Sequence, residues 1–162
     1  MQNIHEFVSK MSEYFARSNH ALFSELALDL SKFEPPEIEF TIPFNGSFST
    51  SSHSGTYPLG VYSIFLDSVL GIGSLVATGT RVPVATLSLT VENIAANQLG
   101  ESLRAVGRTD ALINDIAYAS GALYGASTGQ LLARASGAFA INTKGPGFGE
   151  HMIGTINSEC SS

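Results

Sequence analysis

The chain has 162 residues, 44% of them hydrophobic and 14% charged, and its 8 Lys and Arg against 14 Asp and Glu give a net charge of −6. This length most simply makes one globular domain with a core of its own. The lack of a Lys/Arg cluster argues against a duplex nucleic acid partner. A single cysteine, Cys160, excludes an internal disulfide and favours a reducing compartment, so we expect a cytoplasmic protein.

Two amphipathic helices are predicted at the start of the chain. Residues 3–16 place their apolar side chains on one helical face, and residues 20–33 continue the pattern. Pro35 and Pro36 end it. The N-terminus has no apolar core of the signal-peptide type. We therefore predict a helical segment, residues 1–36, ahead of the main domain.

A strand, a loop and a long helix are expected next. Residues 38–44 alternate apolar and polar side chains, which predicts a first strand. Residues 45–57 are rich in Gly and Ser and are predicted to be a loop. Pro58 suits the first position of a helix, because its missing N–H costs nothing there. We expect this helix to run to about residue 75 and to fray or bend near Gly71 and Gly73.

Asp67 is the one charged side chain between residues 54 and 80. The helix around it is hydrophobic nearly all round, which is typical of burial in a core. A carboxylate placed there loses hydration and must find partners, and carboxylates held in this way are frequent at functional sites. A hydrogen-bonded core acid is the structural alternative. A membrane span over residues 59–77 is disfavoured by Asp67 at its middle and by three internal glycines.

From residue 82 the hydrophobic period changes to two, which predicts strands. After the first of them, three more are expected at residues 101–112, 116–125 and 130–142, with turn signals at Asn114-Asp115 and at residues 127–129. The order predicts an α+β domain over residues 37–143. In it, a curved antiparallel sheet of about five strands, the last four forming a meander, wraps around the long helix. Residues 144–162 are predicted to be a loosely ordered tail.

Three short motifs carry a resemblance to a known family. In the first, Gly60 stands seven residues before Asp67. The second is a small-residue loop with Leu-Gly-Glu, matched here by Asn97-Gln98-Leu99-Gly100-Glu101. The third is a turn of the type Thr-Gly-Lys-Leu-Ile-Ala, matched here by Thr128-Gly129-Gln130-Leu131-Leu132-Ala133. In this order and at these separations, residues 38–142 resemble the hotdog-fold thioesterases, specifically the phenylacetyl-CoA thioesterase-like branch.

The resemblance implies an acyl-CoA thioesterase for a medium-chain or aromatic acyl group. Gly60 would offer an N–H to the oxyanion at the helix N-terminus, and Asp67 would be the general base or the nucleophile. Thr86 would position water from the neighbouring subunit, with an ordinary polar strand residue as the alternative. The candidate substrate-binding residues are Tyr62, Phe65 and Leu66 along a tunnel, His53 in the preceding loop and Asn114 in the turn near the CoA phosphates. Core packing and a plain surface histidine are the alternatives for the tunnel residues and for His53.

Departures from the family leave a second function open. Pro58 and Leu59 stand where the family has His-Gly, and the turn at Asn114 brings no positive charge. Arg108, Arg134 and Lys144 are the other candidates for the CoA phosphates. A non-catalytic acyl-thioester-binding or assembly protein is therefore the alternative hypothesis.

The expected partners are an acyl thioester and a second copy of the chain. No metal or cofactor is expected, because the four histidines are scattered and no Cys/His cluster exists. The long helix has more apolar surface than one five-stranded sheet covers, which predicts a homodimer with its sheets joined edge to edge and Asp67 near the interface. A further pairing of two dimers stays open.

Overall fold

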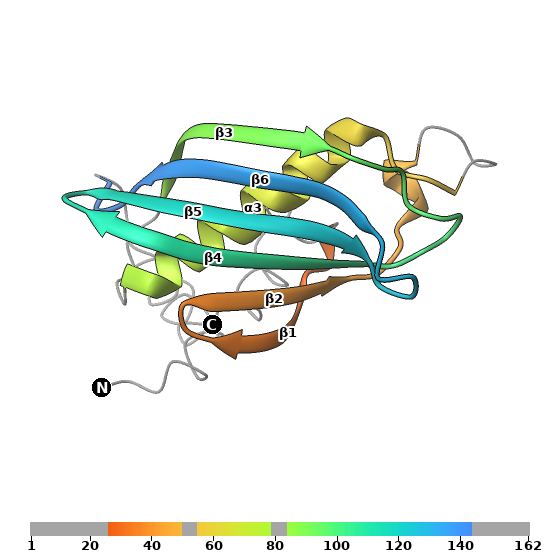
Figure 1. Ribbon diagram of the computed structural model, residues 1–162, viewed down its shortest axis with the longest axis horizontal. Coiled ribbons are helices and arrows are strands. Elements are labelled where there is room, and N and C mark those ends of the chain that lie inside the picture. Colours follow the sequence, from red (N-terminus) through yellow and green to blue (C-terminus); the bar gives the residue numbers. More distant parts are fainter. Residues whose placement is uncertain (1–25, 50–54, 79–83, 144–162) are drawn as a thin grey trace, which may run out of the picture.

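The computed structural model describes residues 26–49, 55–78 and 84–143 (Figure 1). Its elements are β1 (Asp29–Glu34), β2 (Glu37–Ile42), the short 3-10 helix η1 (Gly46–Phe48), α3 (Leu59–Thr78), β3 (Ala85–Asn93), β4 (Leu103–Ile113), β5 (Ile116–Gly125) and β6 (Leu131–Ala140). The strands form one antiparallel sheet in the order β1-β2-β4-β5-β6-β3. α3 crosses one face of this curved sheet, so the predicted α+β architecture is confirmed.

Small residues in the central strands let α3 pack closely on the sheet. A Cβ atom added at Gly107 of β4 would lie 3.0 Å from Val69 Cγ1, and one at Gly121 of β5 would lie 2.9 Å from Leu70 Cδ2. By length and mean hydropathy (1.7), α3 also resembles a membrane span, but half of that stretch is buried inside the molecule. Its apolar surface therefore forms the core together with the inner face of the sheet.

The helix runs without a break through Gly71 and Gly73 to Thr78, so the predicted fraying at these glycines is wrong. Gly73 faces Ile38 of β2, and a Cβ there would lie 3.2 Å from Ile38 Cγ2. This glycine thus allows a close approach between the helix and the strand.

The predicted second helix is wrong over residues 29–33, because residues 29–34 form β1, an edge strand paired with β2. Leu30 and Phe33 are opposite Phe40 and Ile38 of β2, and a bulge between Leu30 and Lys32 brings both side chains to the core side. The bulge turns a period of two into a spacing of three, which looks helical in the sequence. Residues 29–34 therefore belong to the sheet domain, while residues 1–25 and 144–162 lie outside the described part of the chain.

The position of β3 also differs from the prediction. β4, β5 and β6 form the expected meander, but β3 pairs with β6 rather than with β4 and lies at the edge of the sheet. Nine residues long, it is exposed over most of its length, and Leu87 keeps 58% of its surface open. Alternating hydrophobicity predicts that a segment is a strand, but it does not predict which strand lies beside it.

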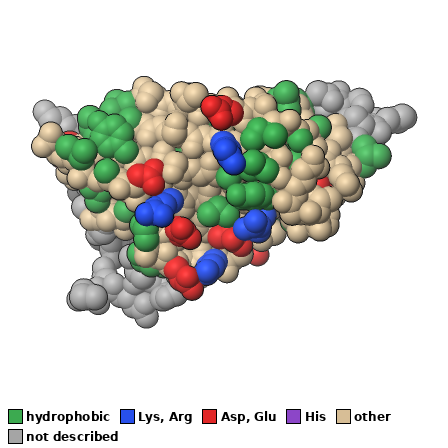
Figure 2. Space-filling view, viewed as in Figure 1, with side chains coloured by type: hydrophobic (Ala, Val, Ile, Leu, Met, Phe, Trp, Pro, Cys, Tyr) green, Lys and Arg blue, Asp and Glu red, His purple; other side chains and the backbone are tan. Residues whose placement is uncertain are grey.

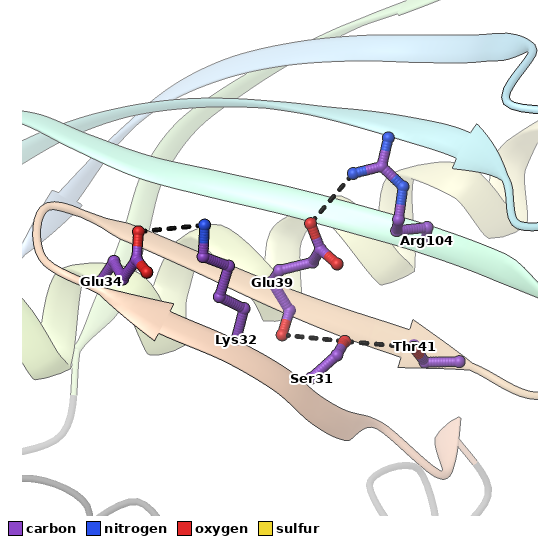
Figure 3. Close-up of polar contacts among 6 residues, drawn as sticks. All are labelled: Ser31, Lys32, Glu34, Glu39, Thr41 and Arg104. Atoms are coloured by element: carbon purple, nitrogen blue, oxygen red, sulfur yellow. Dashed lines mark hydrogen bonds and ion pairs between the residues drawn. The ribbon is translucent and has the colours of Figure 1, made fainter.

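The outer face of the sheet, which points away from α3, is mixed in charge. Figure 2 shows Lys and Arg side chains beside Asp and Glu on this face. At its β1 edge, Lys32 Nζ lies 3.0 Å from Glu34 Oε2, and Arg104 Nη1 donates to Glu39 Oε2 at 2.9 Å (Figure 3). Ser31 on the same edge bonds the hydroxyl of Thr41 at 3.1 Å. The β1 edge is thus short, bulged and charged, which are features that discourage pairing with another strand.

Candidate functional site

α3 leaves one stripe of its surface incompletely covered by the sheet. The members of this stripe recur every three or four residues: Gly60, Ser63, Ile64, Asp67, Ser68 and Gly71. Asp67 lies in the middle of the stripe and is partly exposed, so the expected burial of its carboxylate in the core is wrong for the single chain. The reason is the 3.6-residue period, which turns Asp67 away from the fully buried side of α3 and toward the edge strand β3.

Asp67 has a hydrogen-bond partner on the neighbouring edge strand. Thr86 Oγ1 of β3 donates to Asp67 Oδ1 at 2.9 Å. The two residues are 19 positions apart in the sequence, and the fold brings them together within one protomer. Within one protomer Thr86 therefore contacts Asp67 of its own chain, and the expected role of Thr86 in positioning water from the neighbouring subunit stays a prediction.

Gly60 is the second residue of α3, at a helix start without a side-chain cap. Pro58 has no polar side chain, and the first turn contains no acid. Val61 N–H donates to Pro58 O at 2.9 Å, whereas the N–H groups of Leu59 and Gly60 have no acceptor among the described residues. A Cβ at Gly60 would meet nothing within 4 Å, so the surface there is open. Two free donors therefore stand at the positive end of the helix dipole.

A buried polar cluster lies beside this helix start, centred on Asn97, which is 3% exposed. Asn97 Oδ1 accepts hydrogen bonds from Tyr57 N–H at 2.9 Å and Tyr62 O–H at 3.2 Å, and Asn97 N–H donates to Tyr62 Oη at 2.8 Å. Burial raises the pKa of both tyrosine hydroxyls, which keeps them protonated at neutral pH. The sequence singled out Asn97 only as part of a motif, and a lone amide in a loop carries no periodic signal.

Glu101 connects two of the sequence motifs, the loop at residues 97–101 and the turn at residues 128–133, by hydrogen bonds. Its Oε1 accepts from Ser127 Oγ at 2.8 Å, Thr128 Oγ1 at 2.8 Å and Thr128 N–H at 3.0 Å, and its Oε2 accepts from Gln98 N–H at 3.0 Å. Burial raises the pKa of the Glu101 carboxyl, but the hydrogen bonds from Ser127, Gln98 and Thr128 outweigh burial and lower the pKa to about 2. The segments 97–101 and 128–133 therefore meet at one carboxylate.

The three predicted tunnel residues lie in the core of the protomer. Tyr62, Phe65 and Leu66 are all buried, and the ring of Phe65 meets that of Tyr57 edge-on with centroids 5.5 Å apart. The core-packing alternative accounts for these contacts, and a role of these residues in lining an acyl tunnel stays a prediction.

The candidates for the CoA phosphates are not brought to Asp67 within one protomer. Asn114 is exposed in the β4–β5 turn with φ 54°. Arg108 and Arg134 line a shallow depression of about 320 Å³ on the outer face of the sheet, away from α3. His53 and Lys144 lie outside the described residues. Within the described ranges, no group of three or more His, Cys, Asp or Glu side chains is arranged to hold a metal ion.

Comparison with known proteins identifies the fold. No family model and no curated protein sequence matches the chain. Among solved structures, a thioesterase superfamily protein superposes with a TM-score of 0.71 at 19% identity, covering 83% of this chain and 97% of that chain. Zebrafish thioesterase superfamily member 2 gives 0.70 at 14% identity, with coverages of 85% and 97%.

A third similar structure, a hypothetical thioesterase protein with coenzyme A from Streptococcus pneumoniae, gives a TM-score of 0.61 at 13% identity, with coverages of 71% of this chain and 88% of that chain. Identities this low establish the architecture rather than the activity. The helix laid across a curved antiparallel sheet, together with these superpositions, shows that the chain has the hotdog fold that these solved structures share.

Proposed function

We propose that the protein hydrolyses acyl-CoA thioesters with a medium-chain or aromatic acyl group, at a site shared between two copies of the chain. The observation that carries this proposal is the position of Asp67, on the partly exposed stripe of α3, hydrogen-bonded by Thr86 and seven residues after the free N–H of Gly60. Two solved structures of this fold contain acetyl CoA or coenzyme A, which supports a CoA thioester as the ligand.

The proposed chemistry uses a base and an oxyanion site. Asp67 takes a proton from a water molecule as the water oxygen attacks the thioester carbonyl carbon. The carbonyl π electrons move to the oxygen, and this oxyanion is bound by the N–H of Gly60 at the helix N-terminus. When the carbonyl re-forms, the C–S bond breaks, the thiolate of CoA takes up a proton, and the free acid remains. Direct attack by Asp67 on the carbonyl is the nucleophilic variant of this path.

The distance between these groups favours a shared site. Seven residues of α-helix span about 10 Å, because each residue adds about 1.5 Å. A thioester carbonyl bound at Gly60 is therefore better reached by the partner subunit's Asp67 than by Asp67 of the same helix. In this arrangement, each of two equivalent sites combines the helix start of one protomer with the acid and the threonine of the other.

The free edge of the sheet gives the partner a place to bind. β3 is nine residues long and carries one charge, Glu92, whereas β1 is six residues long and carries Asp29, Lys32 and Glu34. Long, weakly charged edges pair with other strands far more readily. A two-fold pairing of β3 with its own copy would continue the sheet across both subunits. It would also place the Asp67–Thr86 pair of each protomer at the edge that meets the partner, because Thr86 lies on β3.

The test is thiol release from a panel of acyl-CoAs by the wild type, Asp67→Asn and a matched control. Asp67→Asn should lower kcat by about 10²- to 10⁴-fold, as expected for loss of a general base. Asp110→Asn, which changes an exposed acid paired with Arg108 on the outer face, should leave kcat unchanged. Activity that survives Asp67→Asn would remove Asp67 from the chemistry. A fully active monomer of 17.1 kDa in light scattering would contradict the shared site.

The alternative is a non-catalytic protein that binds acyl thioesters. The observation that favours it is Leu59, whose side chain is 46% exposed next to Gly60 at the helix start, where the resembled family has glycine. A side chain there crowds the approach of a substrate to the backbone. Saturable binding of acyl-CoA without thiol release from any member of the panel would decide for this function.

A further inference from the structure

We infer that Asn97 is a positioning residue, which fixes the start of α3 so that the N–H of Gly60 points into the thioester site; this inference rests on the proposed function. Asn97 has no contact with the stripe that carries Asp67 among its hydrogen bonds, so it acts through the helix rather than on the substrate.

The start of α3 needs such support because it has no capping side chain of its own. A helix N-terminus is usually fixed by a Ser, Thr, Asp or Asn side chain that bonds its first free N–H groups. Pro58 has no such side chain, and the first turn contains no acid. A side-chain cap would also occupy the donors that an oxyanion requires. An anchor that binds α3 at other atoms leaves the N–H groups of Leu59 and Gly60 free.

Asn97 forms hydrogen bonds to the chain on both sides of Gly60. Its Oδ1 accepts from the backbone N–H of Tyr57, three residues before Gly60, at 2.9 Å. The same oxygen accepts from the hydroxyl of Tyr62, two residues after Gly60, and the Asn97 N–H donates back to that hydroxyl at 2.8 Å. All of these groups are buried, and buried donors without acceptors are costly, so the bonds restrain the backbone from both directions.

The anchor is itself attached to the sheet. Asn97 Nδ2 donates to Gln98 O at 2.8 Å, and Gln98 N–H donates to Glu101, which holds Ser127 and Thr128 of the β5–β6 turn. Gly100 N–H also donates to Gly55 O at 2.8 Å, just ahead of the helix. A continuous series of hydrogen bonds thus connects the backbone around Gly60 to the β5–β6 turn at the end of the sheet.

The expected effect is on the rate rather than on substrate binding. A misplacement of about 1 Å at a catalytic group is able to cost about 100-fold in rate, and loss of one oxyanion donor costs about 10²- to 10³-fold. We expect Asn97→Leu, which keeps the branched shape of the side chain but has no donor or acceptor, to lower kcat by about 10- to 100-fold while KM changes less than about threefold. Asn97→Asp keeps an acceptor for Tyr57 and Tyr62 but loses the Nδ2 donor to Gln98 O, so it should recover part of kcat.

A second measurement does not depend on activity. Amide hydrogen exchange at Tyr57 and Val61, whose N–H groups bond Asn97 Oδ1 and Pro58 O, should accelerate about tenfold or more in Asn97→Leu and in Tyr62→Phe, because buried hydrogen bonds that hold the start of α3 are lost. The matched control is Ile38→Val, a buried change that contacts the far half of the same helix at Gly73. It should leave both the exchange at Tyr57 and Val61 and kcat unchanged.

The outcomes separate this inference from the proposed function. If the wild type releases thiol from no acyl-CoA, the proposed function fails, and the exchange measurement still reports whether Asn97 fixes the helix start. Unchanged exchange in both Asn97→Leu and Tyr62→Phe would overturn the inference. An equal loss of kcat in Asn97→Leu and Ile38→Val would also overturn it, because general loosening of the fold would then explain the effect. If Asn97→Leu does not fold, Tyr62→Phe and Asn97→Asp carry the same comparison.

Discussion

Glu101 should contribute to stability in a way that depends on pH. Its carboxylate is 6% exposed and accepts four hydrogen bonds, from Ser127, from Gln98 and twice from Thr128. Glu101→Gln keeps the size of the side chain but replaces one acceptor oxygen with an NH₂ group, which faces donors that need an acceptor. The variant should therefore be less stable than the wild type at neutral pH.

The magnitude follows from the pKa of Glu101, which falls from 4.5 to about 2 on folding. At about 1.4 kcal/mol per pKa unit, this change corresponds to roughly 3 kcal/mol in favour of the ionised form. We expect about 1–2 kcal/mol of it in practice, because the carboxylate borders a surface turn and solvent screens its interactions. Since folding lowers this pKa, the contribution is complete above pH 4.5 and is lost as the pH falls toward 2.

The assay is urea unfolding at one fixed protein concentration, followed by circular dichroism between pH 7 and pH 3. The difference in unfolding free energy between the wild type and Glu101→Gln should shrink as the pH falls below about 4.5. Glu34→Gln is the control, because this glutamate is 72% exposed beside Lys32 and should change stability by less than about 0.5 kcal/mol. A difference for Glu101→Gln that stays constant down to pH 3 would refute the reasoning.

Three further substitutions separate stability from activity. Gly60→Ala should preserve or raise the melting temperature, because open space surrounds the position and Ala favours helix by about 0.5–1 kcal/mol. It should nevertheless lower kcat at least about tenfold, because the added methyl group crowds the free N–H. Full activity would contradict the oxyanion role. Thr86→Val should lower kcat about 10-fold or more without changing the melting temperature, and Thr86→Ser should restore kcat. An unchanged kcat in Thr86→Val would show that the bond to Asp67 has no role in the reaction. Gly125→Ala should lower the free energy of unfolding in urea by about 1–3 kcal/mol, because its Cβ would lie 2.5 Å from Glu101 Oε1. An unchanged free energy of unfolding would mean that the residues around Glu101 are not tightly packed.

The local elements of this fold are predictable from the sequence, but the order of its strands is not. β5 occupies the predicted residues 116–125, because alternating side chains and clear turn residues mark both of its ends. β1 was missed because its bulge replaces the strand period with a spacing of three. The place of β3 beside β6 depends on pairing over about 45 residues of sequence, for which the alternating pattern of one strand carries no information.

The candidate site was predictable to a similar degree. Asp67 stands out because it is the lone charge in an apolar run, and Gly60 stands out by its spacing from Asp67. The bond between Asp67 and Thr86 joins two elements whose relative position only the folded chain defines. Asn97 stands out in the sequence only as part of a motif, because a single amide in a loop has no pattern of its own. Its partners Tyr57 and Tyr62 count as ordinary core aromatics until their polar groups are located.

The two acids near α3 show why burial alone does not select a catalytic group. A buried carboxylate with a displaced pKa is a usual marker of a functional site, and by that criterion Glu101 would be chosen over Asp67. A carboxylate offers about four lone-pair positions, and Glu101 already accepts four hydrogen bonds. Asp67 accepts one bond from another side chain in the described part of the chain and is partly exposed, so it keeps positions that a water molecule is able to occupy. A general base must receive a proton during the reaction, and this requirement assigns Glu101 to the framework and leaves Asp67 as the candidate base.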